Sequence, residues 1–517
     1  MRLALSTTLL ALAATAAAQD TTIVGTRSLG MGGTGVASAD DVTVQYHNPG
    51  ILGFMGRMEK AEAVPAATPA TPVTETKDGK AAPPAAFVRS ASDNNNLGRK
   101  DFGLGIDAQV GVQLRGTLAD QLDKLDKIDY KKIGQNGIQN QQDARDLLTT
   151  LDSFKSLADP GNGFTADATG GLGIRIGHFA VGARFEAQTV GYVQKIDLQN
   201  IGIGLSGAAL ATQVNTNAAA PGGYTPTLLT PAQQAQLATA LGGGVAGTDA
   251  VKALDYQASQ AGITQAQISG LFPDLITVAN GAATSLDNNT TSVTAYGYGI
   301  GEVPVSYGVA FGDHLAIGVT GKYMVGRVYA TNVLVFNKDS QNEIKKVREN
   351  YQQTSQFGVD AGVIARMPYL QVGLTGRNLN NPTFKGPTIA GIKLDDVTID
   401  RQFTAGAAFL KTWSWFSFTL AGDVDLNRTK SLLPGVESQK ASGGVEFVLA
   451  RFLSIRAGAY KNLAYDQDPL VVTAGVGFDL WAMRIDLAAA AATETATWDG
   501  EKYPKEGRVA AQFAIDF

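Results

Sequence analysis

The sequence predicts an all-β fold, a transmembrane antiparallel β-barrel of about fourteen strands. First, residues 508–517 alternate strictly between apolar and other side chains, as in a strand with one face on lipid and one on a lumen. Second, no stretch of 18 apolar residues follows residues 1–18, and lipid tolerates only helices or closed sheets. Third, short and long gaps alternate between the predicted strands, which is typical of outer-membrane barrels.

Composition excludes several classes of function. Charged residues make up only 17% of the 517 residues, which fits strands that give one whole face to lipid. The net charge of −5 gives no reason to expect a nucleic-acid partner. With no Cys and three His far apart in sequence, we expect no disulfide framework, no metal site and no cofactor. No nucleophile–base pair or carboxylate dyad is recognisable, so we predict no catalytic residues and no enzyme activity.

Residues 1–18 are expected to be a cleaved secretory signal. Arg2 supplies the positive start, Leu3 to Leu12 the apolar run, and Ala16 to Ala18 the cleavage site. The alternative, an uncleaved membrane anchor, is disfavoured because the run is short and diluted by Ala and Thr. Residues 59–100 are rich in Ala and Pro, then polar, and are predicted to be a linker. An exported barrel is expected in the bacterial outer membrane.

Between signal and linker, residues 19–58 form a distinct Gly-rich segment. Gly30 to Gly35 match the pattern G-x-G-x-x-G, which in a dinucleotide site stands between a strand and a helix. Turn residues follow instead at 46–50, so a dinucleotide site is not expected. These glycines are more consistent with backbone packed tightly in a confined space.

Residues 101–517 are predicted to form the barrel. Alternation alone would also fit a soluble sandwich, so the loop lengths decide between the two. Tight turns are predicted at 480–483, 450–451, 411–413, 367–368, 312–313 and 177, each separated from the next by a long gap. This rhythm requires 290–311 to be one strand, with a bulge marked by Gly299, Gly301 and Pro304.

The long gaps at 116–162 and 196–288 are predicted to carry helices outside the cell. Leu118, Leu122 and Leu125 form an apolar helical stripe in the first gap. Thr230–Gln233 and Thr264–Gln267 are capping boxes in the second. The helices are interpreted as a lid that shields the barrel, or alternatively as a platform for another molecule.

A resemblance to a known family lies in the Gly-rich segment. Residues 25–41, followed by Tyr46-His47-Asn48-Pro49, resemble the N-terminal hatch of the FadL/TodX family, outer-membrane transporters of long-chain fatty acids and other hydrophobic molecules. A weaker match lies at 373–382, and the helical insert with 172–193 looks closest to the branch of conjugal transfer protein TraF. The resemblance implies a hatch that plugs a fourteen-stranded barrel. The hatch and gating residues it implies are Arg27, Gly30, Gly32, Gly33, Asp40, Asp41, Tyr46, Asn48 and Pro49, with Gly50 replacing the family's usual Ala.

Asp40 and Asp41 are not expected to form a catalytic dyad, because adjacent side chains in an extended segment point apart. We expect them to pin the hatch by pairing with lumen-facing bases. The candidates for these bases are Lys322, Arg366, Arg456, Arg484 or Arg508. Gly182 and Gly191, in the third strand, are expected to pack against the hatch rather than to mark a kink for sideways ligand exit. The C-terminal residues Phe513, Ile515 and Phe517 are predicted to be the signal for the barrel-assembly machinery.

Two functions remain open from the sequence. The first is passive uptake of hydrophobic, fatty-acid-like molecules, gated by the hatch. The second is a non-transporting outer-membrane component of a conjugation or secretion complex. Outer-membrane lipid and the assembly machinery are the expected partners in both cases, with a hydrophobic ligand in the first and envelope proteins in the second.

Overall fold

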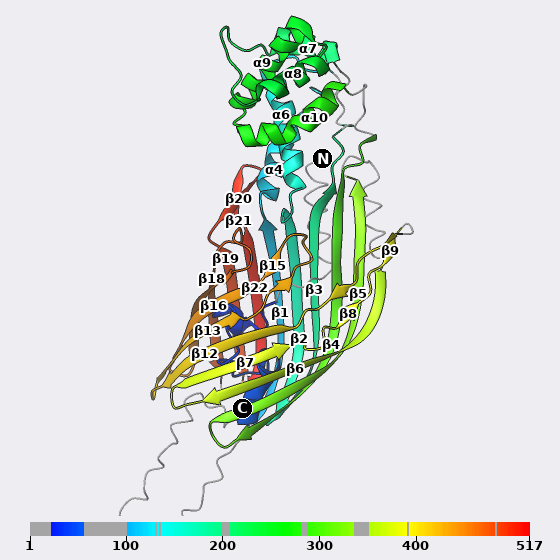
Figure 1. Cartoon of the computed structure of the whole chain (residues 1–517). Coiled ribbons are helices and arrows are strands. Elements are labelled where there is room, and N and C mark those ends of the chain that lie inside the picture. The colour runs from blue at the N-terminus through cyan, green and yellow to red at the C-terminus, as the bar shows by residue number, and fades with distance from the viewer. Residues whose placement is uncertain are drawn as a thin grey trace, which may run out of the picture.

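The chain forms a closed β-barrel with helices beyond one end (Figure 1). The structure is a computed structural model, and the residues it describes are 22–55, 101–129, 132–133, 136–198, 200, 207–280, 288–334, 351–389, 392–480 and 483–516. The predicted signal at 1–18, the predicted linker at 59–100 and Phe517 lie outside these residues. The barrel strands of the described chain are β1 Phe102–Arg115, β2 Gly163–Ile176, β3 Phe179–Lys195, β4 Ser292–Phe311, β5 Leu315–Leu334, β6 Tyr351–Arg366, β7 Leu370–Arg377, β12 Gln402–Thr412, β13 Phe416–Asp425, β16 Lys440–Leu449, β17 Leu453–Asn462, β18 Val471–Leu480, β19 Met483–Ala492 and β22 Glu506–Asp516.

All neighbouring barrel strands are antiparallel, and β1 closes the barrel by pairing with both β2 and β22. The predicted tight turns all lie at one end, which we call the turn end, and the long connections lie at the other, the loop end. The predicted single strand at 290–311 is confirmed as β4. The fold prediction, a closed antiparallel barrel of about fourteen strands, is confirmed.

The predicted bulge in β4 is wrong. β4 pairs with β5 in one continuous register from Ser292 to Phe311, and its register with β3 is unchanged on either side of Pro304. Because proline has no backbone N–H, Pro304 removes one hydrogen bond from the sheet, but the strand register does not change. The register shift in this region lies in β3, between Val193 and Lys195.

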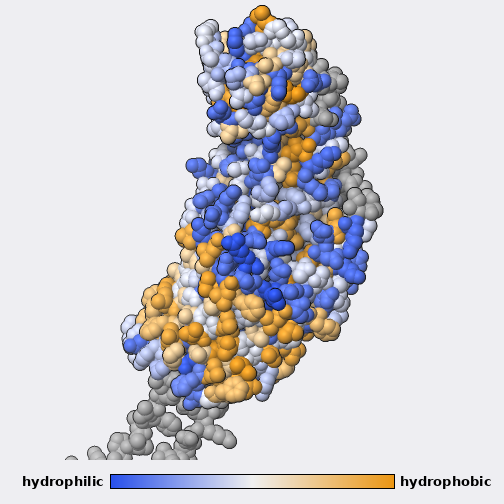
Figure 2. All heavy atoms as spheres, in the orientation of Figure 1, coloured by the Kyte–Doolittle hydropathy of each residue, from blue (hydrophilic) through white to orange (hydrophobic). Residues whose placement is uncertain are grey.

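The outer face of the barrel is apolar near the turn end. On β5, Leu315, Ile317 and Val319 are exposed, whereas the alternate residues Thr320 and Lys322 are buried in the lumen. Figure 2 shows a hydrophobic zone over the half of the barrel nearer the turn end and a polar surface above it. A closed barrel with an apolar outer belt is the form in which a sheet crosses a bilayer.

One wall of the barrel is much taller than the other. β4 and β5 have 20 residues each, and β3 has 17, whereas β16, β17 and β18 have 10 each. At about 3.3 Å per residue, the tall wall extends well past the short one at the loop end. The long connections at the loop end also contain short hairpins. They are β8 Thr383–Phe384 with β11 Val397–Thr398, β9 Thr388–Ile389 with β10 Ile392–Lys393, β14 Thr429–Lys430 with β15 Glu437–Ser438, and β20 Thr495–Trp498 with β21 Glu501–Pro504.

The helices form a lobe beyond the loop end (Figure 1). Those between β1 and β2 or between β3 and β4 are α4 Leu118–Asp126, α6 Gln141–Leu157, α7 Gly207–Asn217, α8 Pro231–Ala240, α9 Gly244–Gln260 and α10 Gln265–Asn280. They share one apolar core, and none of the described helices is long and apolar enough to span a membrane. The lobe is tied to the barrel rim because Asp120 and Asp123 of α4 accept hydrogen bonds from the backbone of the β20–β21 hairpin. The capping box at Thr230 forms as predicted.

Asp255 organises the loop that covers this lobe. Its fully buried carboxylate accepts hydrogen bonds from the Tyr224 hydroxyl and from the backbone N–H groups of Thr227, Leu228 and Leu229. We expect Asp255→Ala to destabilise the lobe by about 3 kcal/mol, because several donors lose a charged acceptor. Limited proteolysis of the full chain should then cut 224–229 faster, with Asp255→Asn intermediate. Equal cutting of all three proteins would contradict this role.

Candidate functional site

Residues 22–55 form a hatch inside the lumen. Its elements are α2 Thr26–Gly30, α3 Val44–His47 and the 3₁₀ helix η1 Pro49–Phe54. α2 packs against β17, β18, β19 and β22, whereas η1 packs against β4, β5 and β6, so the hatch reaches from wall to wall. Nearly every described hatch residue is buried.

The hatch glycines touch the backbone of the wall, as the sequence predicted for a confined space. A side chain at Gly32 would place its Cβ 2.5 Å from the Gly443 carbonyl oxygen and 2.6 Å from that of Ala459. Gly32 also has φ +72°, and its N–H donates to the Thr473 hydroxyl. The Gly30 carbonyl accepts from the same hydroxyl, so Thr473 joins the two glycines to β18. Only glycine fits at such a contact between two backbones.

Asn48 and Pro49 fix the other side of the hatch. The Asn48 side chain caps η1 by accepting from the Gly50 N–H, and it donates to the carbonyls of Val36 in the hatch and Val363 in β6. The wall has glycine where this turn approaches, because a Cβ at Gly362 would lie 2.0 Å from the Asn48 Oδ1. The structure therefore places this motif at a joint between hatch and wall.

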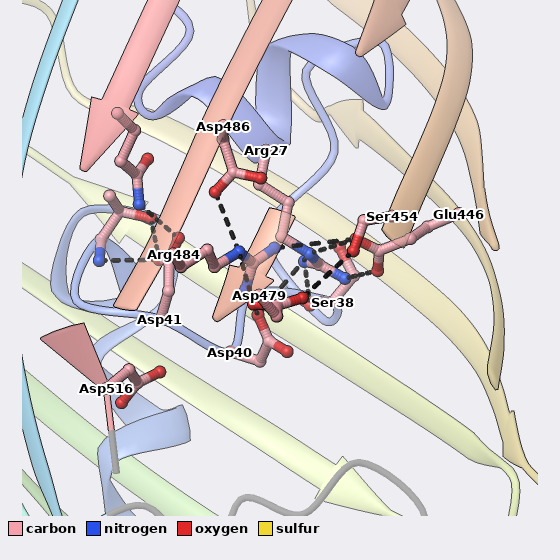
Figure 3. Close-up of polar contacts among 12 residues, drawn as sticks. Arg27, Ser38, Asp40, Asp41, Glu446, Ser454, Asp479, Arg484, Asp486 and Asp516 are labelled. Atoms are coloured by element: carbon pink, nitrogen blue, oxygen red, sulfur yellow. Dashed lines mark hydrogen bonds and ion pairs between the residues drawn. The ribbon is translucent and has the colours of Figure 1, made fainter. Parts of the chain in front are cut away.

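Arg27 is held by a buried cluster of ion pairs. Its guanidinium donates to both oxygens of Glu446 on β16, at 3.1 and 2.5 Å, and to the Ser38 carbonyl at 2.6 Å. Figure 3 shows Arg27 and Arg484 side by side among the carboxylates. We call this group the arginine–carboxylate cluster, and its members are Arg27, Arg456, Arg484, Asp40, Glu446, Asp479 and Asp486.

The predicted pairing with a lumen-facing base is confirmed for Asp40, which meets Arg484, one of the five candidates, whereas Asp41 has other contacts. Asp40 lies 3.9 Å from Arg484 and 3.5 Å from Arg27 of the hatch itself. Asp41 accepts from the Thr43 N–H and hydroxyl, and from Gln512 on β22. The other four bases have different contacts. Arg456 pairs with Glu446 and Asp486, Arg508 with Asp167 and Glu506, and Lys322 with Asp360, while Arg366 lies over the Phe54 ring.

Asp423 on β13 was missed by the sequence reasoning. One of its carboxylate oxygens accepts from the N–H groups of Gly35 and Val36, at 2.7 and 3.0 Å. Like Glu446, it is an inward-facing acid on a strand with an apolar outer face, and that alternation is the signal that could have marked both. The hydrogen bonds that hold the hatch are therefore accepted mainly by carboxylates of the wall, such as Glu446 and Asp423, and less by carboxylates of the hatch.

His47 makes the seating of the hatch sensitive to pH. Burial, together with the nearby charge of Arg377, lowers the pKa of His47 to about 4, and its Nε2 lies 2.9 Å from the Val24 carbonyl. A released His47 titrates near 6.5, so neutral His47 favours the seated hatch above that pH, and the benefit is lost as pH falls toward 4. We expect a loss of about 3 kcal/mol, read as faster proteolysis of the hatch at pH 4.5 than at pH 7. His47→Gln keeps a donor there and should remove this part of the pH dependence; an unchanged profile would contradict it.

The two glycines of β3 differ in what they touch. A Cβ at Gly182 would meet Tyr46 and Gln45 of the hatch at 2.9 and 3.2 Å, which confirms the expected packing on the hatch. A Cβ at Gly191 would meet the Phe164 ring instead, so that expectation is wrong for Gly191. Tyr46 lies under the Arg184 guanidinium, 5.0 Å from it.

Two residues of the predicted assembly signal, Phe513 and Ile515, lie at the turn end, whereas Phe517 is outside the described residues. Phe513 is exposed on the outer face of β22, and Ile515 is half-buried beside it. No group of three or more His, Asp or Glu residues in the described parts of the chain could hold a metal ion.

A cavity of about 90 Å³ lies in the lumen between the hatch and the loops. Its wall is mixed, with Tyr298, Ile300 and Met324 on one side and charged groups elsewhere. The apolar side continues into a buried cluster where Phe384, Val397 and Leu433 from the loops cover the inner wall; we call it the apolar loop cluster.

Arg377, at the end of β7, lines this cavity and the smaller one beside it. It donates to the Gln402 amide oxygen at 3.0 Å, its Nε has no partner, and no carboxylate of the described residues lies within ion-pairing distance. Arg377 is half-buried, and a guanidinium that is partly removed from water normally has a carboxylate partner. Arg377 is thus the basic group at the cavity that is available to an anion.

No curated protein is significantly similar in sequence. The family described as "F plasmid transfer operon, TraF, protein" matches residues 82–425, more than half of the chain. The chain belongs to this family. The predicted TraF branch is thereby confirmed, and the TraF-family match begins after the hatch.

Several solved structures are similar to this TraF-family chain over nearly its whole length. The toluene transporter TbuX of Ralstonia pickettii is 12% identical, with 96% of this chain and 98% of that chain covered and a TM-score of 0.41. The toluene transporter TodX of Pseudomonas putida is 12% identical, with 96% and 98% covered and a TM-score of 0.38. A FadL homologue of Pseudomonas aeruginosa is 8% identical, with 97% and 99% covered and a TM-score of 0.41.

Proposed function

We propose that this chain is a bacterial outer-membrane barrel for passive uptake of hydrophobic small molecules that carry a carboxylate, with the hatch as its gate. The observation that carries the proposal is the cavity beside Arg377. An apolar chain fits against Ile300, Met324 and the apolar loop cluster, and a carboxylate fits the free side of the guanidinium. Apolar pockets with a few convergent polar groups are the usual form of small-molecule sites.

The path of uptake follows from the position of the hatch. The cavity is lined by loop residues such as Ile399 and Asp400 and by hatch residues such as Val24 and Tyr46, so it lies where loops and hatch meet. A ligand enters from the loop end, displaces loop side chains such as Phe384, and passes when the hatch shifts. The apolar outer belt supports a barrel that spans a membrane, and a signal at 1–18, as the sequence predicts, would direct it to the envelope.

The test is uptake by proteoliposomes of a fluorescent long-chain fatty acid and of a neutral hydrocarbon of similar length. Arg377→Gln is expected to reduce fatty-acid uptake at least tenfold while hydrocarbon uptake changes little, because only the fatty acid loses an ion pair. Ile300→Gln should reduce both. Heat-modifiable gel mobility checks that each variant is a folded barrel. Equal uptake by liposomes with and without the protein would overturn the proposal.

A second function, a non-transporting component of a conjugation or secretion complex, is favoured by the helical lobe and by the description of the family. The lobe has its own apolar core and extends beyond the barrel, as a docking platform would. Replacing 207–280 with a short linker separates the functions. If this variant still takes up the ligand but loses an envelope partner in pull-down, the result supports the role in a complex. If it loses uptake and the intact chain has no partner, the result supports uptake.

A further inference from the structure

One part of the lumen wall carries polar side chains, several of which have buried atoms without a hydrogen-bond partner. Inward-facing side chains of β1, β2 and β3 lie next to one another here, because Gln109 pairs across to Thr169 and Asp167 pairs across to Gln188. We call this group the polar seam, and its members are Gln109, Thr165, Asp167, Thr169, Glu186 and Gln188. The seam borders the apolar loop cluster, because Gln188 and Glu186 of β3 pair across to Tyr298 and Ile300 of β4.

The seam contains buried polar atoms that the described residues do not satisfy. Both amide atoms of Gln109 and of Gln188, the Thr165 hydroxyl and one Asp167 oxygen have no hydrogen-bond partner. Gln109 is 2% exposed, and Gln188 and Thr165 are each 1% exposed. Buried amides and hydroxyls in folded proteins are almost always paired. Six unsatisfied atoms at neighbouring positions therefore indicate a polar partner other than the described residues.

The unsatisfied atoms continue from the seam to the hatch. Arg184 lies next along β3 toward the turn end, and its Nε has no hydrogen-bond partner. Its guanidinium stacks on Tyr46 of the hatch, where the Tyr46 hydroxyl and the Gln45 Nε2 also have no partner. The wall has glycine at this level, and a Cβ at Gly173 would lie 3.6 Å from the Gln45 Nε2. Polar atoms without partners thus follow the boundary between hatch and wall from the loop end toward the turn end.

The charges along this boundary are predominantly acidic. Arg184 pairs with Asp107, and Arg508 pairs with both Asp167 and Glu506. Glu186 has no cation within ion-pairing distance among the described residues. Asp107, Asp167 and Glu506 thus share two guanidinium groups, and Glu186 adds a further acidic side chain to the same boundary. When it is ionised, the boundary carries an excess of negative charge, which attracts cations rather than anions.

We propose that the polar seam is a hydrated path by which water and small cations cross the barrel beside the seated hatch, separately from the hydrophobic ligand. Water supplies both donors and acceptors to the Gln109 and Gln188 amides, which an apolar ligand cannot do. The excess of carboxylates, with Glu186 at its centre, selects for cations. The path does not require the hatch to be released. It borders the proposed ligand cavity, because Tyr46, Arg184 and Glu186 also line that cavity, whereas Gln109, Thr165 and Gln188 do not.

Single cysteines test whether the seam is hydrated, since the natural chain has no Cys. Thr165→Cys is compared with Thr375→Cys on β7, because both threonines are lumen-facing and 1% exposed. A small, cationic, membrane-impermeant thiol reagent is expected to label the folded Thr165→Cys variant at least tenfold faster than the folded Thr375→Cys variant. Equal rates, or no labelling of the Thr165→Cys variant, would overturn the proposal.

Conductance in planar bilayers gives the second measurement. The intact protein is expected to pass small K⁺-selective currents, which fall at least threefold in the double variant Gln109→Leu and Gln188→Leu. Gln371→Leu on β7 is the matched control and should leave the current unchanged. Glu186→Gln should reduce K⁺ selectivity with the pore still open. The proposal is refuted if the folded barrel passes no current, or if the double variant passes the same current as the intact protein. Either result counts against the path whether or not hydrophobic uptake is observed.

Discussion

Replacing Arg27 with methionine is expected to release the hatch while the barrel stays folded. The methionine keeps most of the volume but leaves Glu446 without its bidentate partner, in a cluster that already has four carboxylates and three guanidinium groups. Breaking a buried pair from one side typically costs about 3–5 kcal/mol, because the remaining charge stays buried. The hatch residues 22–55 should then be cleaved far faster in limited proteolysis, at unchanged heat-modifiable mobility.

Two further variants separate charge from packing at this site. Adding Glu446→Gln to Arg27→Met removes both charges and should restore much of the protection, since a neutral pair costs less to bury than an unpaired carboxylate. Arg27→Lys keeps the charge but loses the bidentate geometry and should be intermediate. If Arg27→Met resists protease as well as the natural chain, the cluster does not hold the hatch.

The barrel could be predicted from the sequence because its signals are local. Side-chain alternation and loop length are read within about 10–20 residues, and both follow from strand geometry and the bilayer. The bulge was predicted wrongly because it was inferred from local residues alone. In a long, well-paired strand, Pro304 removes one hydrogen bond and leaves the register intact.

The hatch contacts could not be predicted to the same depth. Arg27 and Glu446 are 419 residues apart, and Gly35 and Asp423 are 388 residues apart, so no spacing in one sequence relates them. Alternation could have marked Glu446 and Asp423 as lumen-facing acids, but not which hatch group each one meets. The free guanidinium of Arg377 depends on where carboxylates are missing in three dimensions, which no local pattern records.

The glycines at 32 and 33 provide the sharpest test of how closely the hatch is fitted. Both have positive φ, +72° and +96°, so alanine is strained by a similar amount at either site, about 1–2 kcal/mol. A Cβ at position 32 meets wall backbone at 2.5–2.7 Å, which cannot move away, whereas at 33 it meets the end of the Ile23 side chain at 3.2 Å, which can. Gly32→Ala is therefore expected to destabilise the seated hatch by at least about 2 kcal/mol more than Gly33→Ala, from overpacking against a rigid wall. Hatch proteolysis rates of the two variants measure the difference, and equal rates would mean that the wall yields or that the hatch does not rest on it.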